Sequence, residues 1–182
     1  MRFLALIGAL AIVAAIGAAV YFFGGFYSVA AQYDDPAPVN WALVQARTRS
    51  IDRHAKDQPP GDLQSRVEAG GRAFATRGCP TCHGAPGVEW AKFSEGLNPS
   101  PPDLKDVAKD LEPQQIFWVV KNGIRMTGMP SFAGAGAPDD EIWSIAAFVK
   151  KLPEVKEEDY KSWTTAAAPA GQSAAETPAP KP

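Results

Sequence analysis

The chain has 182 residues and a net charge of −2, with 18 Lys and Arg against 20 Asp and Glu. This length allows one modest domain plus appendages, and the near-neutral charge argues against a nucleic-acid-binding protein. Seventeen prolines and sixteen glycines cluster outside the stretches of helical pattern and indicate long connections between helices.

The first element is an apolar stretch at the N-terminus. No charged residue occurs in 3–33, and residues 3–23 are almost wholly apolar. As a helix, about 21 such residues cross roughly 30 Å of hydrocarbon, so we expect residues 1–33 to form a retained transmembrane anchor. A signal peptide cleaved after Ala30 is the alternative, but the apolar region of a signal peptide normally has about 7–15 residues.

Charges on either side of this stretch predict its orientation. Arg2 precedes it, whereas Asp34 and Asp35 follow it. Because basic flanks stay on the cytoplasmic side, we expect a cytoplasmic N-terminus and the rest of the chain outside. Aromatic residues within 21–27 resemble the belt found at a membrane interface.

The segment 34–61 is predicted to hold one helix and a linker. Asn40 is a candidate N-cap for a helix over about 41–57, in which arginines are interspersed among apolar residues. Such a mixture suits a helix lying on lipid headgroups or against a partner subunit, and it equally suits a solvated spacer. Residues 58–61, which include two prolines, form the linker.

The next helix is predicted to begin at Asp62 as its cap and to run to about Arg77. Gly70 and Phe74 share one face of this helix, and a glycine there permits a second helix to cross closely. The predicted partner is the terminal helix, 139–152. It has an apolar stripe, three acidic residues in its first turn and two lysines in its last.

Both cysteines of the chain lie in the motif Cys79-Pro80-Thr81-Cys82-His83. This pattern is typical of covalent haem attachment of the c type, in which two thiols on one helical turn add to the haem vinyl groups. His83 would then supply a neutral imidazole as the proximal iron ligand. A disulfide or a thioredoxin-like redox pair is the alternative, but it needs a βαβ pattern and leaves His83 without a role.

A long connection rich in Gly and Pro, 84–102, follows the motif. A loop of this length inside a compact domain usually wraps something, and a haem edge is the natural candidate. We expect the backbone carbonyl of Pro102, or that of Pro101, to accept a hydrogen bond from Nδ1 of His83. Such a bond fixes the orientation of the imidazole and strengthens its donation to a metal.

Pro113 is predicted to begin a helix that runs to Asn122 and closes at Gly123. On this helix, Trp118 is large enough to face a haem propionate. The second histidine of the chain, His54, is a candidate sixth iron ligand or a proton-linked contact to a quinone-type partner. More often such a histidine is simply a surface residue.

The predicted sixth iron ligand is Met129, which lies between Gly128 and Pro130. A thioether favours the ferrous state and raises the potential, and a tight turn can hold its sulfur toward the metal. Met126 is the rival within the same stretch, and an open site is the third possibility.

The tail 164–182 is rich in Ala and Pro and is predicted to be disordered, which leaves 62–163 as the haem domain. This domain carries 12 basic and 15 acidic side chains, a net charge of −3. Lys92, Lys121 and Arg125 are candidates to surround an exposed haem edge.

Taken in order, the motifs resemble those of class I cytochrome c over about residues 62–153. They are Gly70-x-x-x-Phe74, Cys79-Pro80-Thr81-Cys82-His83-Gly84, Pro101-Pro102-Asp103-Leu104, Gly128-Met129-Pro130 and an aromatic terminal helix. The resemblance implies an all-α class I cytochrome c fold around one covalent haem c, here preceded by a single N-terminal transmembrane helix. It also implies Cys79 and Cys82 as thioether sites, with His83 and Met129 as axial ligands. The stretch ahead of the domain is similar to that of proteobacterial membrane-anchored monohaem cytochromes.

The resemblance predicts an electron carrier rather than an enzyme, with no catalytic residue, no small-molecule substrate and no nucleic acid. Redox proteins of a respiratory chain would donate and accept its electrons. Covalent haem is attached on the outer face of the bacterial inner membrane, so the haem domain is expected in the periplasm. Two alternatives stay open. One is a fixed cytochrome c subunit of a membrane oxidoreductase complex, docked through 41–57. The other is a haem enzyme or gas sensor with a displaceable sixth ligand.

Overall fold

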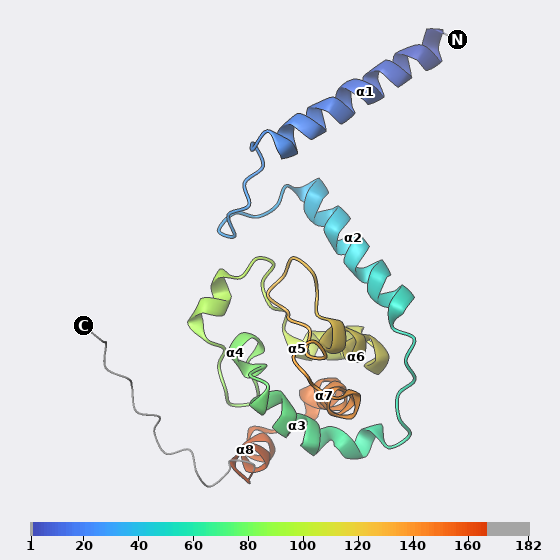
Figure 1. The fold of residues 1–182 in the computed structure, drawn as a ribbon. Helices are drawn as coiled ribbons and strands as arrows, with labels where there is room; N and C mark the ends of the chain where they lie inside the picture. The colour runs from blue at the N-terminus through green and yellow to red at the C-terminus, as the bar shows by residue number, and fades with distance from the viewer. Residues whose placement is uncertain (1, 167–182) are drawn as a thin grey trace, which may run out of the picture. The chain divides into compact units, whose positions relative to one another are not determined.

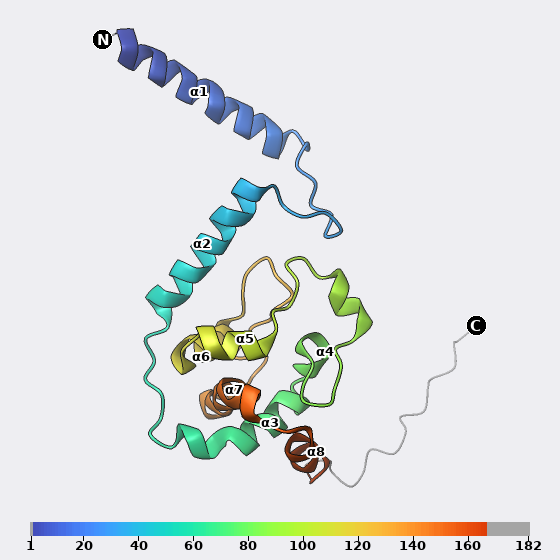
Figure 2. The ribbon, with the colours of Figure 1, turned by 180° about the vertical axis from the view of Figure 1, so that it is seen from behind.

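The computed structural model describes residues 2–166, and within that range the regular structure is helical with no strand. Figures 1 and 2 show the ribbon from two opposite sides. The chain divides into two compact units, the first ending at Asp35 and the second beginning at Pro36. The all-α prediction is therefore confirmed for the described residues.

The first unit consists mainly of helix α1, Arg2–Phe23. Its mean hydropathy over an 18-residue window is 2.7 and none of its residues is buried, so α1 is long and apolar enough to cross a membrane. It is the single candidate span among the described residues. The connection after it is held by a hydrogen bond that the Tyr27 hydroxyl donates to the Asp35 carboxylate.

The second unit begins with helix α2, Ala37–His54, whose N-cap is Pro36. The prediction that Asn40 caps this helix is wrong, because the helix begins before that residue. Pro38 is tolerated in its first turn, where the backbone N–H groups have no partner within the helix. Helix α2 packs on helix α6, Pro113–Asn122. Its buried side chains lie near its C-terminal end, at Ile51 and just beyond at Ala55.

The centre of the domain is the crossing of helix α3, Val67–Thr76, and helix α7, Asp139–Lys151. A Cβ added at Gly70 would overlap the carbonyl oxygen of Ser144, so the two backbones are in contact there. One turn later, the rings of Phe74 and Phe148 lie 5.1 Å apart. The predicted close crossing is confirmed, and only glycine permits it.

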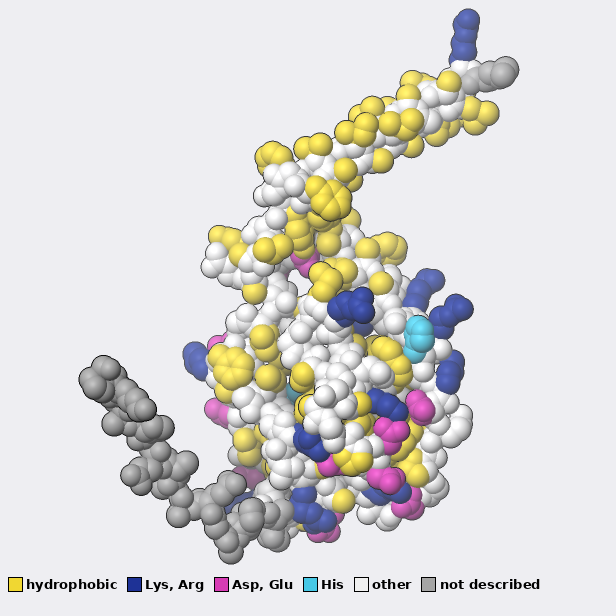
Figure 3. Space-filling view, in the orientation of Figure 1, with side chains coloured by type: hydrophobic (Ala, Val, Ile, Leu, Met, Phe, Trp, Pro, Cys, Tyr) yellow, Lys and Arg dark blue, Asp and Glu magenta, His cyan; other side chains and the backbone are white. Residues whose placement is uncertain are grey.

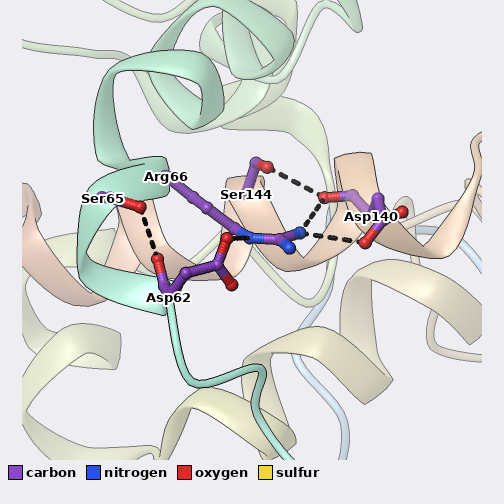
Figure 4. Close-up of polar contacts among 5 residues, drawn as sticks. All are labelled: Asp62, Ser65, Arg66, Asp140 and Ser144. Atoms are coloured by element: carbon purple, nitrogen blue, oxygen red, sulfur yellow. Dashed lines mark hydrogen bonds and ion pairs between the residues drawn. The ribbon is translucent and has the colours of Figure 1, made fainter.

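The Asp62 side chain does not cap a helix as predicted. The chain forms a short 3₁₀ helix, Leu63–Arg66, ahead of α3, and the Asp62 carboxylate accepts from Arg66 Nε at 3.0 Å. Figure 4 shows the same guanidinium reaching Asp140 at the start of α7, where Nη1 lies 3.0 Å from Oδ1. The Asp140 carbonyl accepts from the Ser144 hydroxyl. The Asp62 carboxylate therefore bonds to Arg66 instead of to backbone N–H groups. Through its second bond to Asp140, Arg66 links the chain before α3 to the start of α7.

An additional helix that the sequence analysis did not predict, α8, spans Glu157–Ala166. It packs on α3, where a Cβ added at Gly71 would lie 2.9 Å from the Trp163 ring, and Tyr160 stacks on Phe148 at 5.6 Å. The predicted tail 164–182 therefore begins too early, because its first three residues are helical. The rest of that tail lies outside the described residues.

Four further short elements complete the fold of the described residues. Helix α4 spans Pro80–His83, a 3₁₀ helix spans Lys92–Gly96 and helix α5 spans Leu104–Asp110. A last 3₁₀ turn, Leu152–Glu154, follows α7 directly. The buried core is drawn mainly from α6 and α7, and its largest fully buried side chains are Phe74, Phe117, Phe148, Ile142 and Ile145.

Candidate functional site

The cysteine motif forms a single helical turn, α4, with Cys79 as its N-cap and Gly84 as its C-cap. The Cys79 amide donates to the Phe74 carbonyl at 3.1 Å, which hangs this turn directly from α3. The His83 amide donates to the Cys79 carbonyl at 3.1 Å. Both thiols are free and half-buried, so the predicted spacing of two thiols and one imidazole on one turn is present.

Burial raises the pKa of the Cys79 thiol to about 12. Thiol–disulfide exchange and metal binding require a thiolate, and reactive Cys-x-x-Cys pairs have lowered pKa values. The environment of Cys79 therefore opposes the redox-pair alternative.

The His83 imidazole is held in one orientation. Its Nδ1 lies 3.1 Å from the carbonyl oxygen of Pro102, as the sequence analysis expected for that pair. A carbonyl only accepts, so Nδ1 carries the proton and Nε2 keeps its lone pair. Burial also lowers the pKa of this imidazole, which favours its neutral form. A neutral imidazole with a free Nε2 is the form that binds a metal.

The connection 84–102 is tied back to the turn that precedes it. The Ala91 amide donates to the Thr81 carbonyl at 2.8 Å, and Ala85 and Val88 exchange backbone hydrogen bonds. Ser94 is buried and donates to the Ala91 carbonyl. Hydrogen bonds to backbone carbonyls, within this connection and to the Cys79–His83 turn, therefore fix its conformation.

Met129 lies in a loop closed by hydrogen bonds among its own residues. The Ile124 amide donates to the Met129 carbonyl at 3.1 Å. The Thr127 hydroxyl donates to the Ile124 carbonyl at 2.8 Å and accepts from the Met129 amide at 3.1 Å. Sequence analysis did not single out Thr127, although a threonine beside Gly-Met-Pro is the type of residue that bonds to nearby backbone.

The two methionines of this loop differ in burial. Met129 is half-buried and packs against the core cluster. Met126 is 83% exposed and adopts a φ of +61°, a conformation that L residues rarely take. This difference favours Met129 over Met126 as a side chain directed inward.

Leu97 brings the two segments together. A Cβ added at Gly128, the residue before Met129, would lie 3.1 Å from a methyl group of Leu97, which belongs to the connection after α4. The His83 segment and the Met129 segment are thus in contact through this side chain. A leucine inside an irregular loop carries no periodic signal, so sequence reasoning could not have found it.

Trp118 and His54 meet each other at the packing of α2 on α6. Their rings stack with centroids 6.0 Å apart, and His54 Nδ1 lies 2.8 Å from the Ser50 carbonyl. The His54 imidazole is exposed at the end of α2. This contact gives Trp118 a structural role in seating α2. Its contact with a haem stays a prediction.

No group of three or more His, Cys, Asp or Glu side chains among residues 2–166 could hold a bare metal ion. The donors present are two half-buried thiols on one turn, an imidazole with a free Nε2 and a half-buried thioether. This set fits a haem attached through two cysteines, with an imidazole and a thioether as iron ligands. The residues of the site therefore fit the predicted group.

Comparison with known proteins agrees with this chemistry. Residues 65–149 match the family model described as cytochrome c oxidase, cbb3-type, subunit III. No curated protein and no solved structure matches the chain. The matched segment runs from the 3₁₀ helix before α3 to the last turn of α7, and it contains all the predicted iron and thioether positions.

Proposed function

We propose that the protein carries single electrons between respiratory partners while α1 anchors it in the membrane, because residues 65–149 match a family model of a cytochrome c oxidase subunit. A bound haem supplies the one-electron ferric–ferrous couple. In this proposal Cys79 and Cys82 hold the haem covalently, and His83 and Met129 bind its iron. In this proposal the chain orients the haem, excludes water from it and holds its two iron ligands in place.

The observation that carries the proposal is the hydrogen bond from His83 Nδ1 to the Pro102 carbonyl, 3.1 Å long. It leaves Nε2 as the sole basic nitrogen of a half-buried ring that follows two cysteines on one turn. Axial imidazoles are held in this manner, because the outer hydrogen bond sets the tautomer and the ring plane. A histidine in a purely structural role would not need both cysteines beside it.

The proposed location is the periplasmic face of a bacterial inner membrane, with the N-terminus in the cytoplasm. Arg2 before α1 and Asp34 and Asp35 after it support this orientation through the positive-inside rule. Anchoring replaces free diffusion by a high effective concentration near membrane partners. Lys121 pairs with Asp139 at 2.8 Å and its side chain is 29% exposed. Lys92, although 3.7 Å from Glu95, and Arg125 are both exposed and are therefore the more accessible candidate contacts to a redox partner.

The ferric absorption spectrum in the far red tests the ligand set. A weak thioether-to-iron charge-transfer band is expected in the wild type and in Met126→Ala, and it is expected to be absent in Met129→Ala. Met126 is the matched control because it lies three residues away and is 83% exposed. A band that survives in Met129→Ala, or that disappears in Met126→Ala, would overturn the assignment of Met129.

A second function is a fixed subunit of a membrane oxidoreductase complex. The family description, which names an oxidase subunit, favours it. Mild detergent extraction followed by size analysis separates the two proposals. A carrier is expected to run alone, whereas a subunit brings stoichiometric partners. Ferrous protein that binds carbon monoxide readily would instead favour a haem enzyme or sensor with a displaceable ligand.

A further inference from the structure

Helix α2 carries a cluster of cationic side chains that form no ion pair within the described part of the domain. Arg47, Arg49 and Arg53 are exposed and form no ion pair with any residue in 2–166. Arg49 and Arg53, four residues apart, lie on one side of the helix and form what we call the arginine face of α2, whereas Arg47 lies on another side. Figure 3 shows Lys and Arg side chains gathered over α2 beside a histidine.

The arginines of the neighbouring helices behave in the opposite way. Arg66 pairs with Asp62 and Asp140, Arg72 with Glu68, and Arg77 with Glu141. The only acid within α2 is Asp52, and its carboxylate accepts from the Gln115 side chain of α6 at 2.7 Å. Asp52 therefore helps to dock α2 on the domain, and it forms no ion pair with the arginines of its own helix.

The geometry of α2 turns part of this cluster outward. Ile51 and Ala55 are both 7% exposed and mark the side of α2 that faces the domain. Arg49 and Arg53 are four residues apart and lie on the opposite side of the helix. The docked end of α2 therefore presents a basic surface away from the domain.

Exposed apolar side chains accompany the basic ones. Trp41 is 67% exposed and Leu43 is 47% exposed, and both belong to the N-terminal half of α2. Residues 24–36 separate α1 from α2, and a chain of that length extends to at most about 45 Å. If α1 spans the bilayer, α2 cannot leave the neighbourhood of the lipid surface. Arginines combined with exposed Trp and Leu are the composition of helices that lie in a membrane interface.

We propose that the arginine face of α2 binds anionic lipid headgroups. An acidic protein surface is the alternative occupant, but it gives no role to exposed Trp41 and Leu43 so close to a membrane anchor. Because α2 is packed on α6, lipid binding by α2 also restrains the rotation of the whole domain about its tether. This inference does not depend on whether Met129 binds the iron.

The test uses the full haem-loaded chain in nanodiscs of phosphatidylcholine alone or of an equimolar mixture with phosphatidylglycerol. Amide hydrogen exchange is followed for peptides that cover 37–55. We expect slower exchange in the anionic discs, and we expect the difference to vanish in about 1 M NaCl, where the Debye length is about 3 Å. Each arginine replaced by glutamine should reduce the protection about fivefold at low ionic strength.

The decisive variant is the triple substitution of Arg47, Arg49 and Arg53 by Gln, with Arg49→Gln/Arg53→Gln as a milder second variant. The matched control replaces Lys92, Lys105 and Lys161 by Gln, which changes the net charge equally at exposed sites outside α2. Exchange of α3 and α7 peptides reports whether each variant is folded. Equal exchange in both kinds of disc would overturn the proposal, as would protection that survives the triple substitution. Protection of α2 seen only in native membranes would also overturn it and would indicate an acidic protein partner.

Discussion

The two segments proposed to hold the iron leave their helices through nearly identical turns. Helix α4 ends at Gly84 with φ +66° and ψ −176°, and helix α6 ends at Gly123 with φ +68° and ψ −176°. This backbone region is populated almost only by glycine. One turn immediately follows His83, and the other opens the loop to Met129.

The surroundings of the two glycines differ. A Cβ at Gly123 would lie 2.6 Å from the carbonyl carbon of Pro130 and 2.8 Å from the carbonyl oxygen of Met129. A Cβ at Gly84 would meet the Val88 carbonyl at 3.1 Å and the Trp90 ring at 3.6 Å. The two glycines thus have the same dihedral angles, but the space for a Cβ is filled by backbone atoms at Gly123 and is less tightly filled at Gly84. The proposed thioether position is therefore the more sensitive to backbone change.

The largest effect is expected for Gly123→Ala. Unfavourable dihedral angles and overlap with backbone atoms together should lower the free energy of unfolding by about 3–4 kcal/mol. The loop must move to relieve the overlap, so the far-red ferric band should be lost even in folded protein. Urea titration and the ferric spectrum measure the two consequences. Gly96→Ala is the control, because a Cβ there meets nothing within 4 Å, and it should change stability by less than about 0.5 kcal/mol.

Gly84→Ala should have a smaller effect. The dihedral cost alone is about 1–3 kcal/mol, and the nearest side chain, the exposed Trp90 ring, can move away. The far-red band should persist, because Met129 belongs to the other segment. Urea titrations and ferric spectra of the two alanine variants test this difference. A larger loss of stability in Gly84→Ala, or loss of the far-red band in that variant, would contradict the greater sensitivity of the Gly123 segment.

The smallest effect concerns α8, which supports the histidine side. A Cβ at Gly87 would overlap the Glu157 side chain of this helix. Burial raises the pKa of Tyr160, on the same helix, to about 12. The unfolded chain loses the tyrosine proton near pH 10, before the folded chain does, so the free energy of unfolding should fall as pH rises from about 10 to about 12.

Urea midpoints measured across this pH range would detect the change. Tyr160→Phe removes the titrating hydroxyl and should show a weaker decline than the wild type over the same range. Parallel curves for the two proteins would mean that Tyr160 ionises equally in both states and that α8 is looser than its packing indicates.

The parts of the fold that follow from local rules could be predicted. Gly70 and Phe74, four residues apart, predicted the crossing of α3 and α7, and Pro113 and Gly123 predicted the bounds of α6. The histidine hydrogen bond to Pro102 was also predictable, because a stiff proline run follows the motif at a distance that the chain can close.

Other features depend on competition between partners, which the sequence does not rank. The sequence allowed the Asp62 carboxylate to cap a helix, but in the structure it bonds to Arg66, which also bonds to Asp140. Helix α8 was missed because the Ala and Pro content of the tail masked a local signal. Three acids open that helix, and Tyr160 and Trp163 lie three residues apart on one face. Thr127 and Leu97 act through loop geometry alone.

The close contact between Gly70 and Ser144 also bears on how the domain folds. These residues come from opposite ends of the domain, and contacts between distant parts of a chain form slowly, because a long loop must close first. During synthesis, α3 and the Cys79–His83 turn that follows it emerge before α7 can pack on α3. If Cys79 and Cys82 attach a haem as proposed, their thiols are more accessible to it in that interval than in the folded chain, where both cysteines are half-buried.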